Sequence, residues 1–207
     1  SSRVKIMTGR DGYRNYVRFG TLDRSEPTFG TMLKNAGYAT AVAGKWQLHG
    51  APNGSLAPAC GFDSHCLWNY PGTERSRFWK PSIMQNGALL NTTERDYGPD
   101  IFLDFVTDFI HKNKDRPFFV YYPMVLVHAP YVRTPDSTDS QAKSLTLFQD
   151  MTAYADKCVG RLIDALEEDG LRKNTVVIYT TDNGTGRSLS YPFADEQRQG
   201  EKAWATD

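Results

Sequence analysis

The sequence predicts an α/β protein with a mainly parallel β-sheet and helices on both faces of that sheet. Two observations support this class. Amphipathic helical stretches alternate with short apolar runs along the chain, and such alternation is typical of parallel sheets covered by helices. The apolar runs are nearly continuous rather than alternating, as in strands that are buried on both sides. The 207 residues, 40% of them hydrophobic, suffice for one domain with a substantial core.

A helix followed by a strand begins the predicted core. Residues 28–36 carry apolar side chains at helical spacing, and Gly37 suits the end of that helix. Residues 38–43 then form a predicted strand that ends at Gly44-Lys45. Residues 47–93 are irregular, rich in Gly, Pro and aromatic residues, with only short strand-like pieces near residues 67–70. A loop region of this length inside a compact domain is usually functional or poorly ordered.

The second half of the chain repeats the order of helix and strand. Residues 99–112 form an amphipathic helix, and residues 117–127 form a nearly continuous apolar run that stops at His128. Residues 143–169 predict a long helix with one buried stripe. Residues 176–180 are β-branched and apolar and predict another buried strand.

Composition excludes some partners. The 24 basic and 24 acidic residues give no net charge, so no basic field indicates nucleic acid. The longest apolar runs are too short to cross a bilayer, so we expect no membrane segment. Cys60 and Cys66 flank a short loop and could pair, but three reduced thiols, with Cys158, are an equally good interpretation. The cysteines therefore do not determine the compartment.

Polar side chains follow three of the predicted strands. Lys45, His128 and the pair Asp182-Asn183 each stand where a strand ends. If these strands are parallel neighbours, the side chains meet at one edge of the sheet, where ligands of such folds bind. A carboxylate and an amide oxygen suit Ca²⁺ or Mg²⁺, and the cationic groups suit an oxyanion ester. Taken singly, each has a plainer interpretation: a turn, a solvated lysine, a structural histidine.

Several motifs in order along the chain resemble the sulfatase family of the alkaline phosphatase superfamily. The opening SSRVKIMTGR is similar to the tail of the family signature C-x-P-S-R followed by an apolar stretch and T-G-R. The other matching stretches are LKNAGYATAVAGKWQL, GFD at residues 61–63, PFFVYYPMVLVHAPY, VVIYTTDNG and GEKAW. Because several separate motifs occur in the family's order, the resemblance is more specific than one motif. It implies an alkaline-phosphatase-like fold.

The resemblance also implies a chemistry, the hydrolysis of sulfate esters. The family's nucleophile is a formylglycine made from the signature cysteine, and a divalent cation, usually calcium, neutralises the sulfate oxygens. By position in the motifs, Arg3 would hold the formylglycine, and Lys45 and Lys202 would bind sulfate oxygens. His128 would bind sulfate near the leaving oxygen. Asp182 and Asn183 would be metal ligands.

The chain departs from the family pattern in several places. Matching Arg3 places the formylglycine two residues before Ser1, outside this sequence. The family's first metal-binding aspartates and its smaller C-terminal domain are also outside, so we expect residues 1–207 to be a catalytic-domain fragment truncated at both ends and inactive alone. Gln47 stands where the family has a histidine thought to help release sulfate. Glutamine cannot act as a base, and His49 is a candidate substitute.

Three functions remain open from the sequence. The first is a sulfuric ester hydrolase core acting on a small-molecule or glycan sulfate ester, with a periplasmic or secreted location implied by the resemblance. The second is a phosphodiesterase or phosphonate monoester hydrolase of the same superfamily, because phosphate and sulfate are similar oxyanions. The third is a non-catalytic fragment that binds oxyanions or metal loosely, or self-associates. Loops such as residues 47–93 would determine the substrate.

Overall fold

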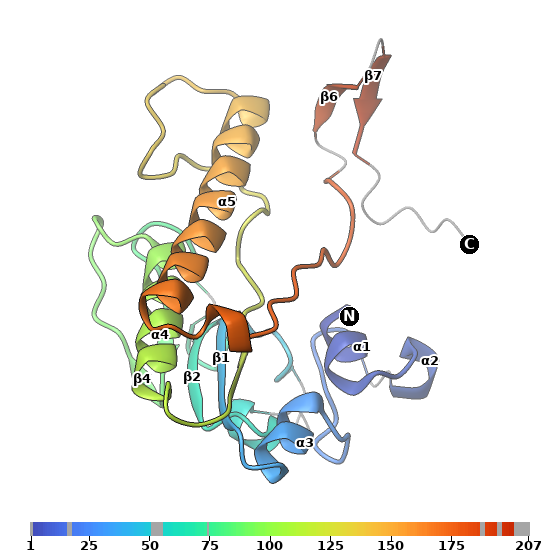
Figure 1. The fold of residues 1–207 in the computed structure, drawn as a ribbon. Coiled ribbons are helices and arrows are strands. Elements are labelled where there is room, and N and C mark those ends of the chain that lie inside the picture. The colour runs from blue at the N-terminus through green and yellow to red at the C-terminus, as the bar shows by residue number, and fades with distance from the viewer. Residues whose placement is uncertain are drawn as a thin grey trace.

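A computed structural model describes residues 2–15, 18–50, 56–73, 75–186, 189–193 and 196–200 (Figure 1). Its elements in chain order are α1 (Ser2–Thr8), α2 (Gly12–Asn15), α3 (Phe29–Asn35), β1 (Ala39–Lys45), η1 (Ala57–Cys60), β2 (Ser64–Trp68), β3 (Met84–Gln85), β4 (Ala88–Leu89), α4 (Gly98–Lys112), β5 (Phe118–Tyr121), α5 (Ser144–Glu168), η2 (Arg172–Asn174), β6 (Ser190–Phe193) and β7 (Glu196–Gln199). The predicted helices at residues 28–36, 99–112 and 143–169 are therefore confirmed as α3, α4 and α5.

The main sheet has five strands in the order β4-β3-β2-β1-β5. Its three longest strands are parallel: β1 pairs with β2 on one side and with β5 on the other, so that Val42 lies opposite both His65 and Tyr121. The short strands β3 and β4 add an antiparallel edge. A mainly parallel sheet is thus confirmed. The predicted strand at residues 117–127 is shorter than expected, because only Phe118–Tyr121 are paired.

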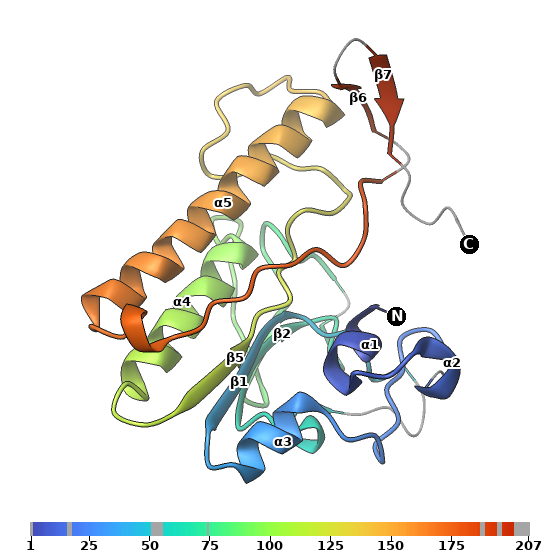
Figure 2. The same cartoon turned by 45° about the vertical axis from the view of Figure 1, so that its right-hand side comes forward.

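Helices cover both faces of the sheet (Figure 2). Successive side chains of a strand point to opposite faces. Val42 accordingly packs in a cluster with Val4 and Met7 of α1, whereas Ala43 packs in a second cluster with residues of α4 and α5. We call these the α1/α3 core and the α4/α5 core. The central strand β1 is buried on both faces, which explains why its sequence is apolar without alternation.

The first turn of helix α3 is capped by Thr28 and Thr31. Thr28 accepts a hydrogen bond from the Thr31 backbone N–H at 3.1 Å, and the Thr31 side chain accepts one from the Thr28 N–H at the same distance. This reciprocal pair satisfies amide groups that a helix start leaves without partners. Phe29 then packs against Phe119 and Tyr121, with 5.2 Å between ring centroids in each case. Capping and packing together place α3 against β1 and β5.

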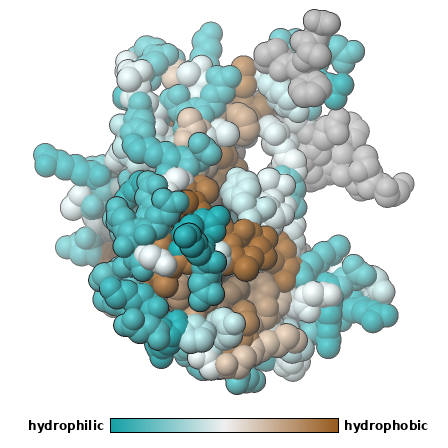
Figure 3. Space-filling view, viewed as in Figure 1, coloured by the Kyte–Doolittle hydropathy of each residue, from teal (hydrophilic) through white to brown (hydrophobic). Residues whose placement is uncertain are grey.

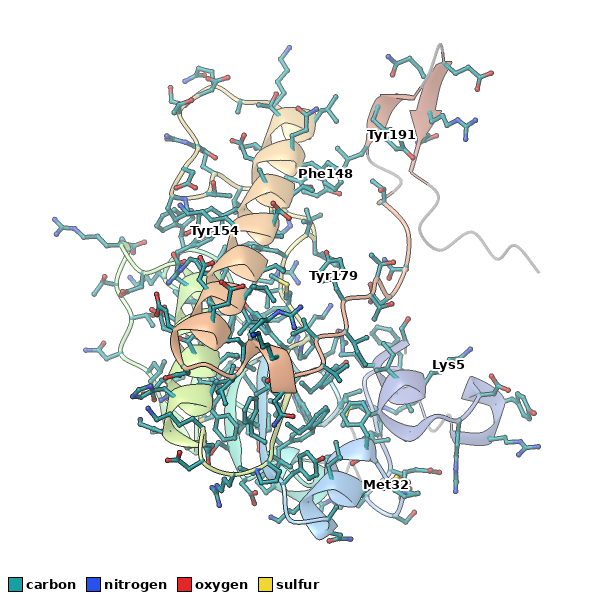
Figure 4. The ribbon with its side chains drawn as sticks, viewed as in Figure 1. Lys5, Met32, Phe148, Tyr154, Tyr179 and Tyr191 are labelled. Atoms are coloured by element: carbon teal, nitrogen blue, oxygen red, sulfur yellow. The ribbon has the colours of Figure 1, made fainter. Side chains whose placement is uncertain are left out.

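The predicted buried strand at residues 176–180 is wrong. In the structure residues 175–181 form no strand, and Val176 and Ile178 are 87% and 83% exposed. Figure 3 shows apolar side chains gathered on this face, and Figure 4 shows Tyr179 on the segment between α5 and β6. A β-branched run becomes a buried strand only beside a partner strand and under covering elements. Among the described strands none pairs with this segment, and β5 is the edge of the sheet.

The three cysteines are buried thiols, so the disulfide interpretation of Cys60 and Cys66 is not supported. Burial raises the pKa of the Cys66 thiol to about 12. In the described part of the chain, no helix combines the length and apolar character needed to span a membrane.

The close contact between Gly44 and Pro123 yields a stability prediction. Gly44 has φ +107°, and a Cβ there would lie 2.2 Å from the Pro123 carbonyl oxygen. Gly44→Ala should lower the free energy of unfolding by about 3 kcal/mol or more, since backbone strain and steric overlap add. Gly72→Ala is the matched control: its φ is +86°, and a Cβ would meet nothing within 4 Å. Gly72→Ala should lower the free energy of unfolding by about 1–2 kcal/mol, because it adds backbone strain without a steric overlap.

Denaturant unfolding of the two variants measures this difference. Equal losses in Gly44→Ala and Gly72→Ala would show that the contact with Pro123 is not as tight as described.

Candidate active site

The candidate site lies where β1 and β5 end. Lys45, the last residue of β1, donates its backbone N–H to the Pro123 carbonyl oxygen at 2.8 Å. Because Gly44 has no side chain, the two backbones can approach this closely. The chain beyond β5 is thereby held against the end of β1, and it continues from Pro123 to His128. The carboxyl edge of parallel strands is where ligands of open α/β folds bind.

The indole of Trp68 connects several cationic side chains at this edge. Trp68 ends β2 and lies opposite Lys45 in the β1–β2 register. Its Nε1–H donates to the Arg75 carbonyl oxygen at 2.7 Å, which fixes the ring. The Arg77 Cζ lies 4.6 Å from the ring centroid and the Lys45 Nζ lies 5.9 Å from it. Both distances are in the range of cation–π contacts.

Arg77 in turn contacts His128. The Arg77 Nη2 lies 3.0 Å from His128 Nδ1 and also donates a hydrogen bond to the Ala129 carbonyl oxygen. His128 is half-buried, whereas Arg77 is only 8% exposed. The structure therefore brings two of the predicted residues, Lys45 and His128, into one cluster with Trp68 and Arg77. We call these four residues the Trp68 cluster.

Arg3 and Gln47 meet at the same end of the sheet. The Arg3 Nη2 donates to Gln47 Oε1 at 2.9 Å. Burial lowers the pKa of the Arg3 guanidinium, while the neighbouring Tyr121 and Asp182 raise it in part. Burial also raises the pKa of the Tyr121 hydroxyl, to about 12. Arg3 thus remains a cation at neutral pH, close to the end of β5 and to Asp182.

Gln47 has an unusual backbone conformation. Its φ is +54°, a left-handed value that non-glycine residues rarely adopt. Its N–H donates to the Asn69 carbonyl oxygen at 2.8 Å, which helps to hold this conformation. Strained residues of this kind occur preferentially at functional sites. The conformation turns the Gln47 side chain toward Arg3.

Asp182 and Asn183 lie near the start of α1. The Ser2 hydroxyl donates to the Asp182 backbone carbonyl at 3.4 Å, and Asn183 Nδ2 donates to the Gly184 carbonyl at 3.0 Å. Both side chains are exposed. Carboxylate and amide oxygens are the donors that Ca²⁺ and Mg²⁺ prefer, so the two residues fit a hard cation chemically. They are too few for a complete site, and no cluster of three or more His, Cys, Asp or Glu side chains occurs among the described residues.

Like Arg3, Gln47, Asp182 and Asn183, the last two predicted residues, His49 and Lys202, do not belong to the four-residue Trp68 cluster. The His49 ring lies 6.3 Å from the Tyr70 ring, and its backbone bridges to Thr21. Tyr70 belongs to the α1/α3 core, whereas Trp68 belongs to the α4/α5 core. His49 therefore lies on the other side of the sheet from the Trp68 cluster. Lys202 lies outside the described residues.

The sequence interpretation missed Arg77, Trp68 and Tyr121 as parts of the site. Arg77 lies within residues 47–93, a long irregular region in which the sequence indicated no particular functional residue. Trp68 and Tyr121 lie at the ends of β2 and β5 in the structure. The predicted strands extended to residues 70 and 127, so no sequence signal pointed to either residue.

The bond from Arg3 and the strained backbone of Gln47 can be tested separately. Gln47→Gly removes the side chain and relieves the strain, while Gln47→Ala removes the side chain and keeps the strain. Both should lose the hydrogen bond to the Arg3 cation, but Gln47→Gly should be the more stable variant by about 1 kcal/mol. Thermal and denaturant unfolding compare them. Equal stability of the two variants would show that the left-handed conformation at Gln47 carries no strain.

Comparison with known proteins supports the family resemblance that the sequence motifs indicate. The profile of the sulfatase family matches residues 1–204. The arylsulfatase of Hemicentrotus pulcherrimus is 28% identical over 217 residues, covering 90% of this chain and 38% of that protein. The human N-acetylgalactosamine-6-sulfatase is 27% identical over 219 residues, covering 88% of this chain and 40% of that protein. The chain thus spans less than half the length of these relatives.

Solved structures show the same fold. A structure described under the metabolism of multiple glycosaminoglycans by Bacteroides thetaiotaomicron matches with a TM-score of 0.69 at 22% identity, covering 94% of this chain and 53% of that one. The crystal structure of Ps i-CgsB in complex with k-i-k-neocarrahexaose matches with a TM-score of 0.65 at 20% identity, covering 82% and 44%. Because the family profile covers nearly the whole chain, this protein belongs to the sulfatase family.

Proposed function

We propose that this chain forms the oxyanion-binding core of a sulfuric ester hydrolase. The observation that carries the proposal is the Trp68 cluster, in which side chains from β1, β2 and the segment after β5 place Lys45 and His128 at one edge of the sheet. Positively charged and hydrogen-bonding groups at such an edge suit a tetrahedral oxyanion. Membership of the sulfatase family favours sulfate over phosphate.

Each residue has a distinct role in this proposal. Lys45 binds a sulfate oxygen as a point charge, and Lys202 is expected to do the same from outside the described residues. His128 meets the ester near its leaving oxygen and donates a hydrogen bond there. Arg3, held by Gln47, stabilises negative charge at the start of α1, next to the position from which the family's formylglycine would act.

A divalent cation, Ca²⁺ or Mg²⁺, belongs to the same proposal. Asp182 and Asn183 would supply a carboxylate and an amide oxygen to it, and further oxygen ligands would have to come from residues other than those described. When bound, such a cation supplies charge neutralisation for the sulfate oxygens. The formylglycine, expected two residues before Ser1, supplies the nucleophile.

The role of Gln47 follows from its contact with Arg3. Since the Gln47 amide oxygen accepts from Arg3, we assign the side chain to holding this cation rather than to proton transfer. His49 packs against Tyr70, with 6.3 Å between the ring centroids. We therefore favour Gln47 as a hydrogen-bonding residue and do not assign proton transfer to His49.

We assign the organic part of the substrate to a pocket formed largely by the segment that follows His128 in the chain. A cavity of about 580 Å³ is lined by Trp79, Val132, Arg133, Thr134, Pro135 and Ser137. The Trp79 Nε1–H donates to the Arg133 carbonyl oxygen at 2.8 Å, which fixes the indole at the cavity wall. An aromatic face and a cation suit a sulfated sugar ring. We therefore favour a glycan sulfate over a small aryl sulfate, and a periplasmic or secreted location where such glycans occur.

Anion binding tests the proposed site. Inorganic sulfate should bind the chain, and Lys45→Ala and His128→Ala should each weaken that binding by roughly tenfold or more, the loss of one charge-assisted hydrogen bond. Lys112→Ala is the control, because this exposed lysine pairs with Asp108 at the far end of α4. Isothermal titration measures all three.

Two outcomes would contradict the proposal. Affinity for sulfate that falls equally in Lys112→Ala would show diffuse charge attraction instead of a site. Tighter binding of a phosphate monoester than of a sulfate monoester would favour the phosphodiesterase alternative.

A further inference from the structure

Arg77 is a buried cation that no sequence motif accounts for. Only 8% of its surface is exposed, and among the described residues no carboxylate forms an ion pair with it. Burying a charge without a counter-charge is costly. A buried guanidinium in this setting therefore needs a reason other than stability.

The contacts of Arg77 hold its guanidinium in one position beside His128. Its guanidinium lies over the Trp68 ring at 4.6 Å and near the Phe78 ring at 5.1 Å, so aromatic faces hold it on its apolar sides. The indole of Trp68 is itself fixed by its hydrogen bond to the Arg75 carbonyl. The Nη2 atom is consequently held beside His128 and Ala129.

Three atoms meet at this point, and they allow two arrangements. Arg77 Nη2 is 3.0 Å from His128 Nδ1, and Nδ1 is 2.7 Å from the Ala129 carbonyl oxygen, to which Arg77 also donates. In the first arrangement, Nδ1 carries no proton and accepts from Arg77, which then donates to both Nδ1 and the Ala129 oxygen, two acceptors 2.7 Å apart. In the second, Nδ1 carries a proton and donates to the Ala129 oxygen, which accepts from both groups, and the Nδ1 proton lies beside the Arg77 cation.

The charge of Arg77 favours the first arrangement. A guanidinium can only donate hydrogen bonds, and burial lowers the pKa of Arg77 to about 10, so the group stays positively charged at neutral pH. A fixed positive charge 3.0 Å from Nδ1 disfavours a proton on that nitrogen. The neutral imidazole then carries its proton on Nε2.

We propose that Arg77 is a positioning residue for His128, holding the imidazole through Nδ1 and keeping its proton on Nε2. Nε2–H is then the group that His128 offers as a hydrogen-bond donor. The meaning of this for catalysis rests on the proposed function, in which His128 donates to an oxygen of the sulfate ester. The orientation and tautomer of the ring do not rest on it, so they can be tested independently.

Nitrogen-detected NMR of the histidine rings tests the tautomer. The chain has four histidines, and single replacement of each assigns the signals. At neutral pH the His128 ring should show one protonated nitrogen, Nε2, and one unprotonated nitrogen, Nδ1. In Arg77→Gln this preference should be lost, giving averaged signals or the opposite tautomer. Arg77→Lys keeps the charge and one donor, and should restore the Nε2–H tautomer in part.

The control is Arg95→Gln, which removes an exposed arginine from the segment between β4 and α4. It should leave the His128 signals unchanged. Circular dichroism establishes that each variant is folded, and if Arg77→Gln does not fold, Arg77→Lys and the parent chain still decide the tautomer. A parent chain with the proton on Nδ1, or a His128 spectrum that is the same in the parent, Arg77→Gln and Arg77→Lys, would overturn the proposal.

A second experiment tests whether the His128 ring contacts sulfate. Addition of inorganic sulfate should shift the His128 Nε2 signal in the parent chain and shift it several-fold less in Arg77→Gln at equal sulfate. Unchanged Nε2 signals in a parent chain with the predicted tautomer would contradict the sulfate site while leaving the role of Arg77 intact. The two failures are therefore distinguishable.

Discussion

The backbone contact between the end of β1 and the chain after β5 is the constraint on which the site depends. The Lys45 N–H and the Pro123 carbonyl are 2.8 Å apart, and they can approach only because Gly44 lacks a side chain. This contact extends the parallel pairing of β1 and β5 beyond Tyr121, where strand pairing itself has ended. Lys45 and the segment that carries His128 are thereby brought to the same edge, although they are far apart in sequence.

Several cationic side chains lie at this edge of the sheet, which suits an anionic ligand. The Lys45 ammonium and the Arg77 guanidinium share one indole, and burial lowers the pKa of both Arg77 and Arg3. Such groups disfavour one another and lose hydration, so the arrangement does not favour folding. A singly or doubly charged oxyanion would interact favourably with these cations. The same reasoning explains why the aromatic rings of Trp68 and Phe78 surround Arg77, since ring faces attract cations without adding charge.

Much of the fold could be predicted from the sequence, because the signals were local. The helices α3, α4 and α5 show helical spacing of apolar residues, and β1 is a buried apolar run that ends in Gly44-Lys45. The strand predicted at residues 176–180 failed because β propensity describes a segment, whereas burial depends on a partner strand. The site residues can be divided in the same way, into those with a local sequence signal and those without one. Lys45 and His128 stand at strand ends and were predictable, whereas Arg77 lies in an irregular loop, and only the tertiary fold brings it to His128.

The central claim is that one oxyanion site is formed by the Trp68 cluster at the ends of β1 and β5. Crystals of the chain grown with selenate, and located by anomalous scattering from selenium, test it most directly. The account predicts a selenate bound within hydrogen-bond distance of both Lys45 Nζ and His128 Nε2. A well-ordered chain whose selenate binds elsewhere, or contacts neither Lys45 nor His128, would contradict it.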